Sequence, residues 1–212
     1  MSSKQISKRG RPPLSGKKAT PDRILDAALE VFSERGFEGA TVRQIAAKVG
    51  VTDPALYAHF KGKKEIFEAL MREAGPGVLI SIAGEDTLRQ LPPQTAIPET
   101  FGAVVDAWTT PRARAFTSLI LRMGPSGIGT ALKEVTLRLK PVFTAWQARG
   151  ATRPDISVDV AIWQVIGPLS SLRLTYMHGD ASEQDIALAT TLARQHLEEM
   201  ARRLTAVGDS EK

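Results

Sequence analysis

The sequence of 212 residues contains no cysteine, only three histidines, and no apolar run approaching the roughly 20 residues that cross a membrane. Without cysteine there are no disulfides and no thiolate metal sites, which favours an intracellular location. The histidines (positions 59, 178 and 196) are scattered, and no metal-ligand spacing, nucleophile motif or phosphate-binding glycine loop accompanies them. We therefore expect a cytoplasmic protein without membrane attachment, enzymatic activity, cofactor or metal.

The excess positive charge is concentrated in the first third of the chain. Residues 1–72 contain 14 Lys and Arg against 8 Asp and Glu, whereas the remaining 140 residues contain 14 against 15. A localised basic surface attracts polyanions such as nucleic acids. Composition alone does not separate this interpretation from an ordinary solvated surface, so the motifs have to decide between them.

The first 19 residues are expected to form a disordered basic arm. They contain six Lys or Arg, no acidic residue and several Pro and Gly. The stretch Lys8-Arg9-Gly10-Arg11-Pro12 resembles the core of an AT-hook, whose arginines enter a narrow minor groove. Arg9 and Arg11 are therefore candidate DNA contacts. The alternative is a tail that supplies only salt-sensitive attraction.

Apolar residues recur at helical spacing from Thr20 onward, where a threonine cap is followed by a proline suited to the first helical position. The first helix is expected to end at Gly36. Further helices are expected at about 98–108, 111–123, 132–146, 156–178 and 182–205, with a turn at 124–127 and a kink at Pro168. Since no strand-like alternation occurs, the chain is predicted to be all-α. It should comprise the arm (1–19), a DNA-binding domain (20–74) and a helical effector-binding and dimerisation domain (75–212).

Two short capped helices between residues 41 and 60 predict a helix-turn-helix. Thr41 and Gln44 have the spacing of a capping box, Gly50 ends the helix, and Thr52 begins the next one, from about Asp53 to Phe60. In such a motif the second helix enters the major groove of DNA.

The outward face of that second helix should read bases. Leu56 and Phe60 are expected to point inward at i, i+4 spacing. The helical wheel then turns four neighbours outward: Pro54, Ala55, Tyr57 and Ala58. Ala55 or Ala58 could meet a thymine methyl group, and Asp53 could accept from a cytosine amine. Asp53 could equally serve only as a favourable charge in the first helical turn.

Several side chains around the motif carry donors suited to phosphates. They are Thr41, Arg43, Thr52, Tyr57, His59 and Lys63. The threonines could be helix caps alone, and Arg43 could be a solvated surface charge.

The run TVRQIAAKVGV (41–51), followed by ALYAHF (55–60) and Lys63, resembles the DNA-binding domain of the tetracycline-repressor (TetR) family over about Ile24 to Leu70. This resemblance implies that Tyr57, His59 and Lys63 brace phosphates. The sequence departs from the family pattern at Lys61-Gly62, where proline and serine are common. It also departs at Asp53, an acidic residue at the front of the reading helix.

The resemblance also implies a helical effector domain with an internal pocket, apolar apart from a few polar anchors. Candidate lining residues are Phe101, Trp108, Phe116, Met123, Phe143, Trp146, Trp163, Gln164 and Tyr176. Arg173 and Asp106 are further polar candidates. Each aromatic residue could instead be ordinary core packing.

The last two helices, at about 156–178 and 182–205, are expected to form a homodimer interface. The helix at 156–178 is apolar on nearly every side and should be buried all round. We therefore predict a repressor that binds a palindromic operator in double-stranded DNA as a homodimer and is released by a small-molecule ligand. The alternative is a DNA-binding regulator or architectural protein with no small-molecule effector, for which a tightly packed C-terminal domain is expected.

Overall fold

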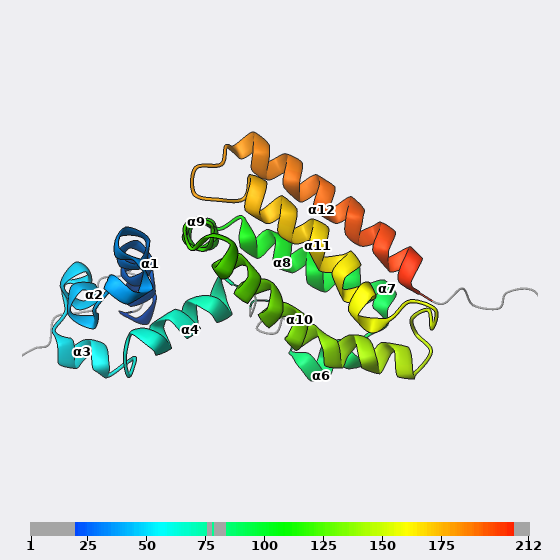
Figure 1. The fold of residues 1–212 in the computed structure, drawn as a ribbon, viewed down its shortest axis with the longest axis horizontal. Coiled ribbons are helices and arrows are strands. Elements are labelled where there is room, and N and C mark those ends of the chain that lie inside the picture. Colours follow the sequence, from blue (N-terminus) through cyan, green and yellow to red (C-terminus); the bar gives the residue numbers. More distant parts are fainter. Residues whose placement is uncertain (1–19, 76–77, 79–83, 206–212) are drawn as a thin grey trace, which may run out of the picture.

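The computed structural model describes residues 20–75, 78 and 84–205 (Figure 1). Within these ranges the chain is helical, with no β-strand and one isolated antiparallel bridge between Thr152 and Thr205. The predicted all-α class is confirmed. The basic arm, with Arg9 and Arg11, lies outside the described residues.

Four helices form the N-terminal unit at one end of the molecule (Figure 1). They are α1 (Thr20–Gly39), α2 (Val42–Val49), α3 (Asp53–Tyr57) and α4 (Lys63–Glu73). Their apolar faces share one core that includes Ile24, Phe32, Ile45, Leu56 and Ile66. Each such side chain contributes about 1.5–3 kcal/mol by leaving water. The predicted end of the first helix at Gly36 is a local break, with φ of 68°, and helical structure continues to Gly39.

The rest of the described chain forms a larger helical unit. Its elements are α6 (Glu85–Gln90), α7 (Pro93–Thr95), the π-helical turn η1 (Ala96–Thr100), α8 (Phe101–Trp108), α9 (Pro111–Arg122), α10 (Gly124–Ala148), α11 (Val158–Tyr176) and α12 (Glu183–Leu204). α11 and α12 pack side by side along one flank (Figure 1). No described helix is long and apolar enough to span a bilayer.

Two local expectations were wrong. Residues 124–127 are the first turn of α10 rather than a separate turn. Gly124 turns the chain with φ of 66°, and Pro125 occupies a position where its missing N–H leaves no hydrogen bond unmade. Pro98 lies inside η1 and does not open a helix.

α11 is not buried all round within one chain. Val160 and Trp163 are 48% and 59% exposed, although the opposite face of the helix is buried. The apolar composition of α11 led to the expectation that the whole helix surface is buried. The neighbouring helices of the same chain cover only one face of it.

α9 belongs to both units of the fold. Its residues Ala113, Phe116, Leu119 and Ile120 complete the core of α1–α4, although α9 follows the predicted domain boundary at residue 74. The second core lies among α6, α8, α10, α11 and α12. The two units therefore meet at α9, and the end of α4 lies close to this junction.

Candidate functional site

The turn between α2 and α3 is fixed by the caps that the sequence predicts. Thr41 Oγ1 accepts from the Gln44 amide at 3.3 Å, and Gln44 Oε1 accepts from the Thr41 amide at 2.9 Å. Gly50 adopts the left-handed conformation (φ 77°, ψ 37°), which a residue without Cβ takes at no steric cost. Thr52 then caps α3.

Ion pairs and hydrogen bonds hold α2 against α1. Lys48 Nζ lies 2.6 Å from Glu30 and 3.0 Å from Glu34, and the hydrogen bonds to these carboxylates raise the pKa of Lys48. Arg23 donates to the Val49 carbonyl at 2.7 Å. The position of α2, the first helix of the motif, is therefore set by α1, and the turn after α2 connects it to α3.

The reading face has the orientation that the helical wheel predicts. Leu56 and Phe60 are buried. The exposed positions are Thr41, Arg43, Thr52, Pro54, Ala55, Tyr57, Ala58 and His59. Tyr57 is 54% exposed although it is large and aromatic, and Asp53 is half-buried.

Lys63 is directed into the protein. Its ammonium donates to the carbonyls of Phe37 (2.9 Å) and Glu38 (3.1 Å), and it lies 4.7 Å from the centre of the Phe37 ring. Lys63 thus joins the start of α4 to the end of α1. A phosphate contact from this residue requires the side chain to exchange these partners.

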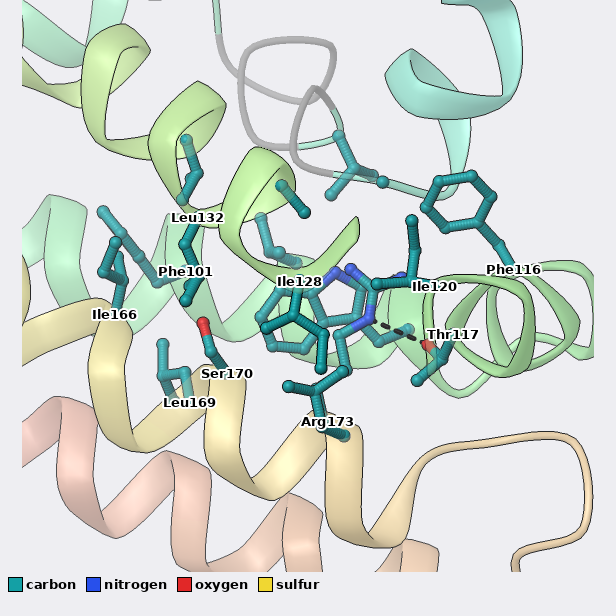
Figure 2. Close-up of a pocket in the computed structure, with 17 residues that line it drawn as sticks. Phe101, Phe116, Thr117, Ile120, Ile128, Leu132, Ile166, Leu169, Ser170 and Arg173 are labelled. Carbon is teal, nitrogen blue, oxygen red and sulfur yellow. Dashed lines mark hydrogen bonds between the residues drawn. The ribbon is translucent and has the colours of Figure 1, made fainter. Parts of the chain in front are cut away.

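A partly open cavity lies between α8, α9, α10 and α11 (Figure 2). The empty space between its walls is about 750 Å³, including the part open to solvent. Its lining is mainly apolar and comprises Gly75, Val78, Phe101, Val104, Trp108, Phe116, Thr117, Ile120, Ile128, Ala131, Leu132, Val135, Ile166, Leu169, Ser170, Arg173 and Leu174. An apolar lining with a few polar groups has the chemical character of a small-molecule site.

Arg173 is the one charged side chain among these lining residues. Its Nε donates to Thr117 Oγ1 at 3.0 Å (Figure 2), and its Nη2 donates to the Ala74 carbonyl. The guanidinium carbon lies 4.7 Å from the centre of the Trp108 ring. Desolvation of the guanidinium by the surrounding protein lowers the pKa of Arg173 to about 9.

The structure brings Phe101, Trp108 and Phe116 to this cavity, together with Arg173. It places the other six sequence candidates elsewhere: Met123, Phe143, Trp146, Trp163, Gln164 and Tyr176. Phe143 and Trp146 pack on each other in the second core, where the Trp146 indole donates to the Leu88 carbonyl at 3.1 Å. Asp106 is exposed and paired with Arg194.

Three further candidates lie on the surface. Trp163 and Gln164 line a groove shared by α11 and α12 that also includes His196, and Met123 is exposed between α9 and α10. Helical periodicity predicts that an apolar residue faces inward, but it does not predict which neighbouring helix that residue contacts. For the same reason Thr117, Ile120, Leu132 and Ser170 carried no signal that would have selected them. In the described part of the chain, no group of His, Asp and Glu is arranged to hold a metal ion.

The sequence model for bacterial regulatory proteins of the tetR family matches residues 24–70, which include the whole helix-turn-helix. The uncharacterized HTH-type transcriptional regulator TtgW of Pseudomonas putida is 35% identical over 111 residues, covering 50% of this chain and 76% of TtgW. This chain belongs to the TetR family of transcriptional regulators. The family consists of DNA-binding regulators and not of enzymes.

Two further similarities agree with this TetR-family assignment, one over a smaller share of the relative and one at lower sequence identity. SrpR of Pseudomonas putida is 35% identical over 109 residues, which span half of this chain and 47% of SrpR. The solved structure of SmeT from Stenotrophomonas maltophilia has a TM-score of 0.63 at 20% identity, covering 90% of this chain and 93% of SmeT. This second similarity extends the shared fold over the C-terminal helices.

Proposed function

We propose that this TetR-family regulator is a homodimeric repressor that a small molecule releases from a palindromic operator. The observation that carries this proposal is the apolar cavity between α8 and α11, which reaches Gly75 just after α4. A ligand shifts a conformational equilibrium only through its different affinity for the two states. A molecule that contacts both the C-terminal helices and the residue after α4 has the means to favour one position of α4.

For DNA, we propose that α3 occupies the major groove. Its exposed Pro54 and Ala55, and Ala58 directly after the helix, would approach base edges, with Asp53 at the front. The proposed phosphate contacts are Thr41, Arg43, Thr52, Tyr57, His59 and, after a change of partners, Lys63. Exposure of the side chains and the rigid caps support these assignments.

For the dimer, we propose the face formed by α11 and α12. Large apolar side chains remain exposed on both helices: Val160, Trp163, Leu188 and Leu192. Large exposed apolar side chains gathered on two adjacent helices are characteristic of an interface. Pairing of two chains through it would hold two reading helices together, as binding to half-sites about 34–36 Å apart requires.

A regulator without a small-molecule effector would be expected to have a tightly packed C-terminal domain. The cavity therefore favours the ligand-controlled alternative. SmeT, described as the repressor of the multidrug efflux pump SmeDEF, offers a fold-level analogy for repression.

The test begins with selection of genomic DNA fragments by the purified full chain near physiological salt, followed by sequencing. We expect an inverted repeat with half-sites about one helical turn apart. Fluorescence anisotropy with that operator would then be used to screen small molecules for DNA release. Enrichment of A·T-rich DNA without a repeat would contradict the operator-specific proposal and support an architectural role for the arm.

A further inference from the structure

We propose that the ligand of this cavity is an amphipathic organic acid, with a hydrocarbon body against the apolar walls and one carboxylate on Arg173. The inference rests on the proposed function only in assuming that the cavity is the effector site. It adds the chemical class of the ligand and the residue that recognises its charge.

The first argument is the missing counter-charge. Arg173 forms no ion pair with any described residue, and the sequence of residues 76–83, PGVLISIA, contains no Asp or Glu. Arg112, whose side chain is 19% exposed, has carboxylate partners, because it pairs with Asp22, Asp26 and Glu73. A cation shielded from water without a partner is costly, and an anionic ligand would offset that cost.

The second argument is an excess of hydrogen-bond donors in the wall. Among the described residues, the bonds of Arg173 use Nε and Nη2 and leave Nη1 without an acceptor. The indole Nε1 of Trp108 is also buried with no acceptor in that part of the chain. Ser170 Oγ faces the same space (Figure 2). A carboxylate supplies acceptors and no donors, and it can engage a guanidinium through two oxygens.

The third argument concerns the body of the ligand. The walls from α8, α10 and α11 are formed by aliphatic and aromatic side chains, including Phe101, Leu132, Ile166 and Leu169. A highly polar acid would lose its hydration there without replacement. The arrangement therefore favours an acid with one charged end and an apolar remainder.

The same arginine connects the cavity to the DNA-binding unit. Arg173 Nη2 donates to the carbonyl of Ala74, the residue that ends α4. A carboxylate that draws the guanidinium toward itself competes with this bond. Binding of the acid would therefore weaken a hydrogen bond that fixes the end of α4.

The test is isothermal titration calorimetry on the purified full chain with decanoate, decan-1-ol and methyl decanoate. We expect the unmodified protein to bind decanoate at least about ten times more tightly than either neutral compound. In Arg173→Met this preference should disappear while decan-1-ol still binds, which also shows that the cavity remains folded. Arg173→Lys should keep part of the preference, because the charge remains but the planar pair of donors is lost.

The matched control is Arg138→Met, which makes the same chemical change at a partly exposed arginine of α10 paired with Glu134. It should bind the three compounds as the unmodified protein does. Equal affinity for acid and alcohol, no saturable binding of decanoate, or an acid preference that survives Arg173→Met would each overturn the proposal. If a neutral compound released the protein from its operator, ligand control would be supported even where the acid proposal had failed. If the acid bound tightly without any effect on operator binding, only the proposed function would be contradicted.

Discussion

At the scale of single residues, the two proposed sites use opposite environments. Tyr57 is a large side chain left in solvent on the reading helix, and Arg173 is a charged side chain enclosed by apolar walls. Neither position stabilises the folded chain. The ring of Tyr57 is largely in solvent, so it contributes little by burial, and the guanidinium of Arg173 loses hydration when it is shielded from water. Both arrangements are consistent with binding roles.

We expect Tyr57→Ala to weaken binding to every operator variant by a similar factor, roughly 5- to 10-fold, which corresponds to one lost hydrogen bond. Phosphate contacts carry no base information, so the preferred sequence should not change. Fluorescence anisotropy over a set of operator variants would measure this. Tyr57→Phe removes only the hydroxyl and should account for most of the loss. A changed base preference would show that Tyr57 reads bases instead.

The lowered pKa of Arg173 predicts a pH dependence of acid binding. Below a pKa of about 9 the guanidinium is protonated and attracts a carboxylate, and above it that attraction is lost. The affinity for decanoate should therefore be constant from about pH 6.5 to 8 and fall above about pH 9. Calorimetry across this range would measure it.

Arg173→Met and the neutral ligand decan-1-ol provide the controls, and neither should show this decline. Arg173 is the only ionisable group among the described lining residues, so titration of another wall residue does not compete with this explanation. A flat decanoate profile up to pH 10.5 would mean that Arg173 keeps its proton throughout.

At the scale of elements, α9 joins the two units through Arg112. Its Nε lies 2.7 Å from Asp26, and its Nη1 lies 3.1 Å from Asp22 and 2.9 Å from Glu73. Arg112 therefore connects the first helix of the fold, the helix after the DNA-reading motif, and a helix of the cavity wall. Its side chain is 19% exposed, so solvent screens these bonds only in part.

We expect Arg112→Met to lower the free energy of unfolding by about 1–2 kcal/mol, because it removes the cation that pairs with three partly exposed carboxylates. Hydrogen exchange of α1 and α4 amides should increase in the same variant. Chemical denaturation and exchange mass spectrometry would measure the two effects.

The comparison variant is Arg122→Met on the same helix, which removes a single bond from Arg122 Nη1 to the Ser33 carbonyl at 3.0 Å. Its cost should stay below about 1 kcal/mol. Equal effects of the two substitutions would mean that the carboxylates around Arg112 add nothing to the junction.

Helix starts were predicted correctly where a cap acts within a few residues, and less well where the same residues suit two structures. α2, α3 and α12 begin at their predicted caps, because a capping box and a left-handed glycine act within a few residues. Residues 124–127 misled the prediction because glycine and proline suit both a turn and the first turn of a helix. Their neighbours in α10 decide between the two.

At the scale of the whole molecule, the exposed face of α11 and α12 should determine the oligomeric state. We expect the double substitution Trp163→Glu with Leu192→Glu to convert a dimer into monomers, because two charges per chain would be desolvated in the interface. Light scattering coupled to size exclusion would measure the mass. Operator affinity should fall with dissociation, because each monomer reaches only one half-site.

Leu137→Glu is the control for added surface charge, since Leu137 is 69% exposed on α10, away from this face. It should leave the mass and operator binding unchanged. A dimer that persists in the double variant would place the interface elsewhere.

The sequence alone determined the helical class, the caps of the reading motif, its inward Leu56 and Phe60, and the family resemblance. Each of these depends on residues a few positions apart, where spacing and backbone chemistry suffice. Only the tertiary structure selected Phe101, Trp108 and Phe116 over the six other pocket candidates, set Arg173 beside the end of α4, and directed Lys63 toward α1. These outcomes depend on which helix faces meet, and the packing of side chains from distant parts of the chain decides that.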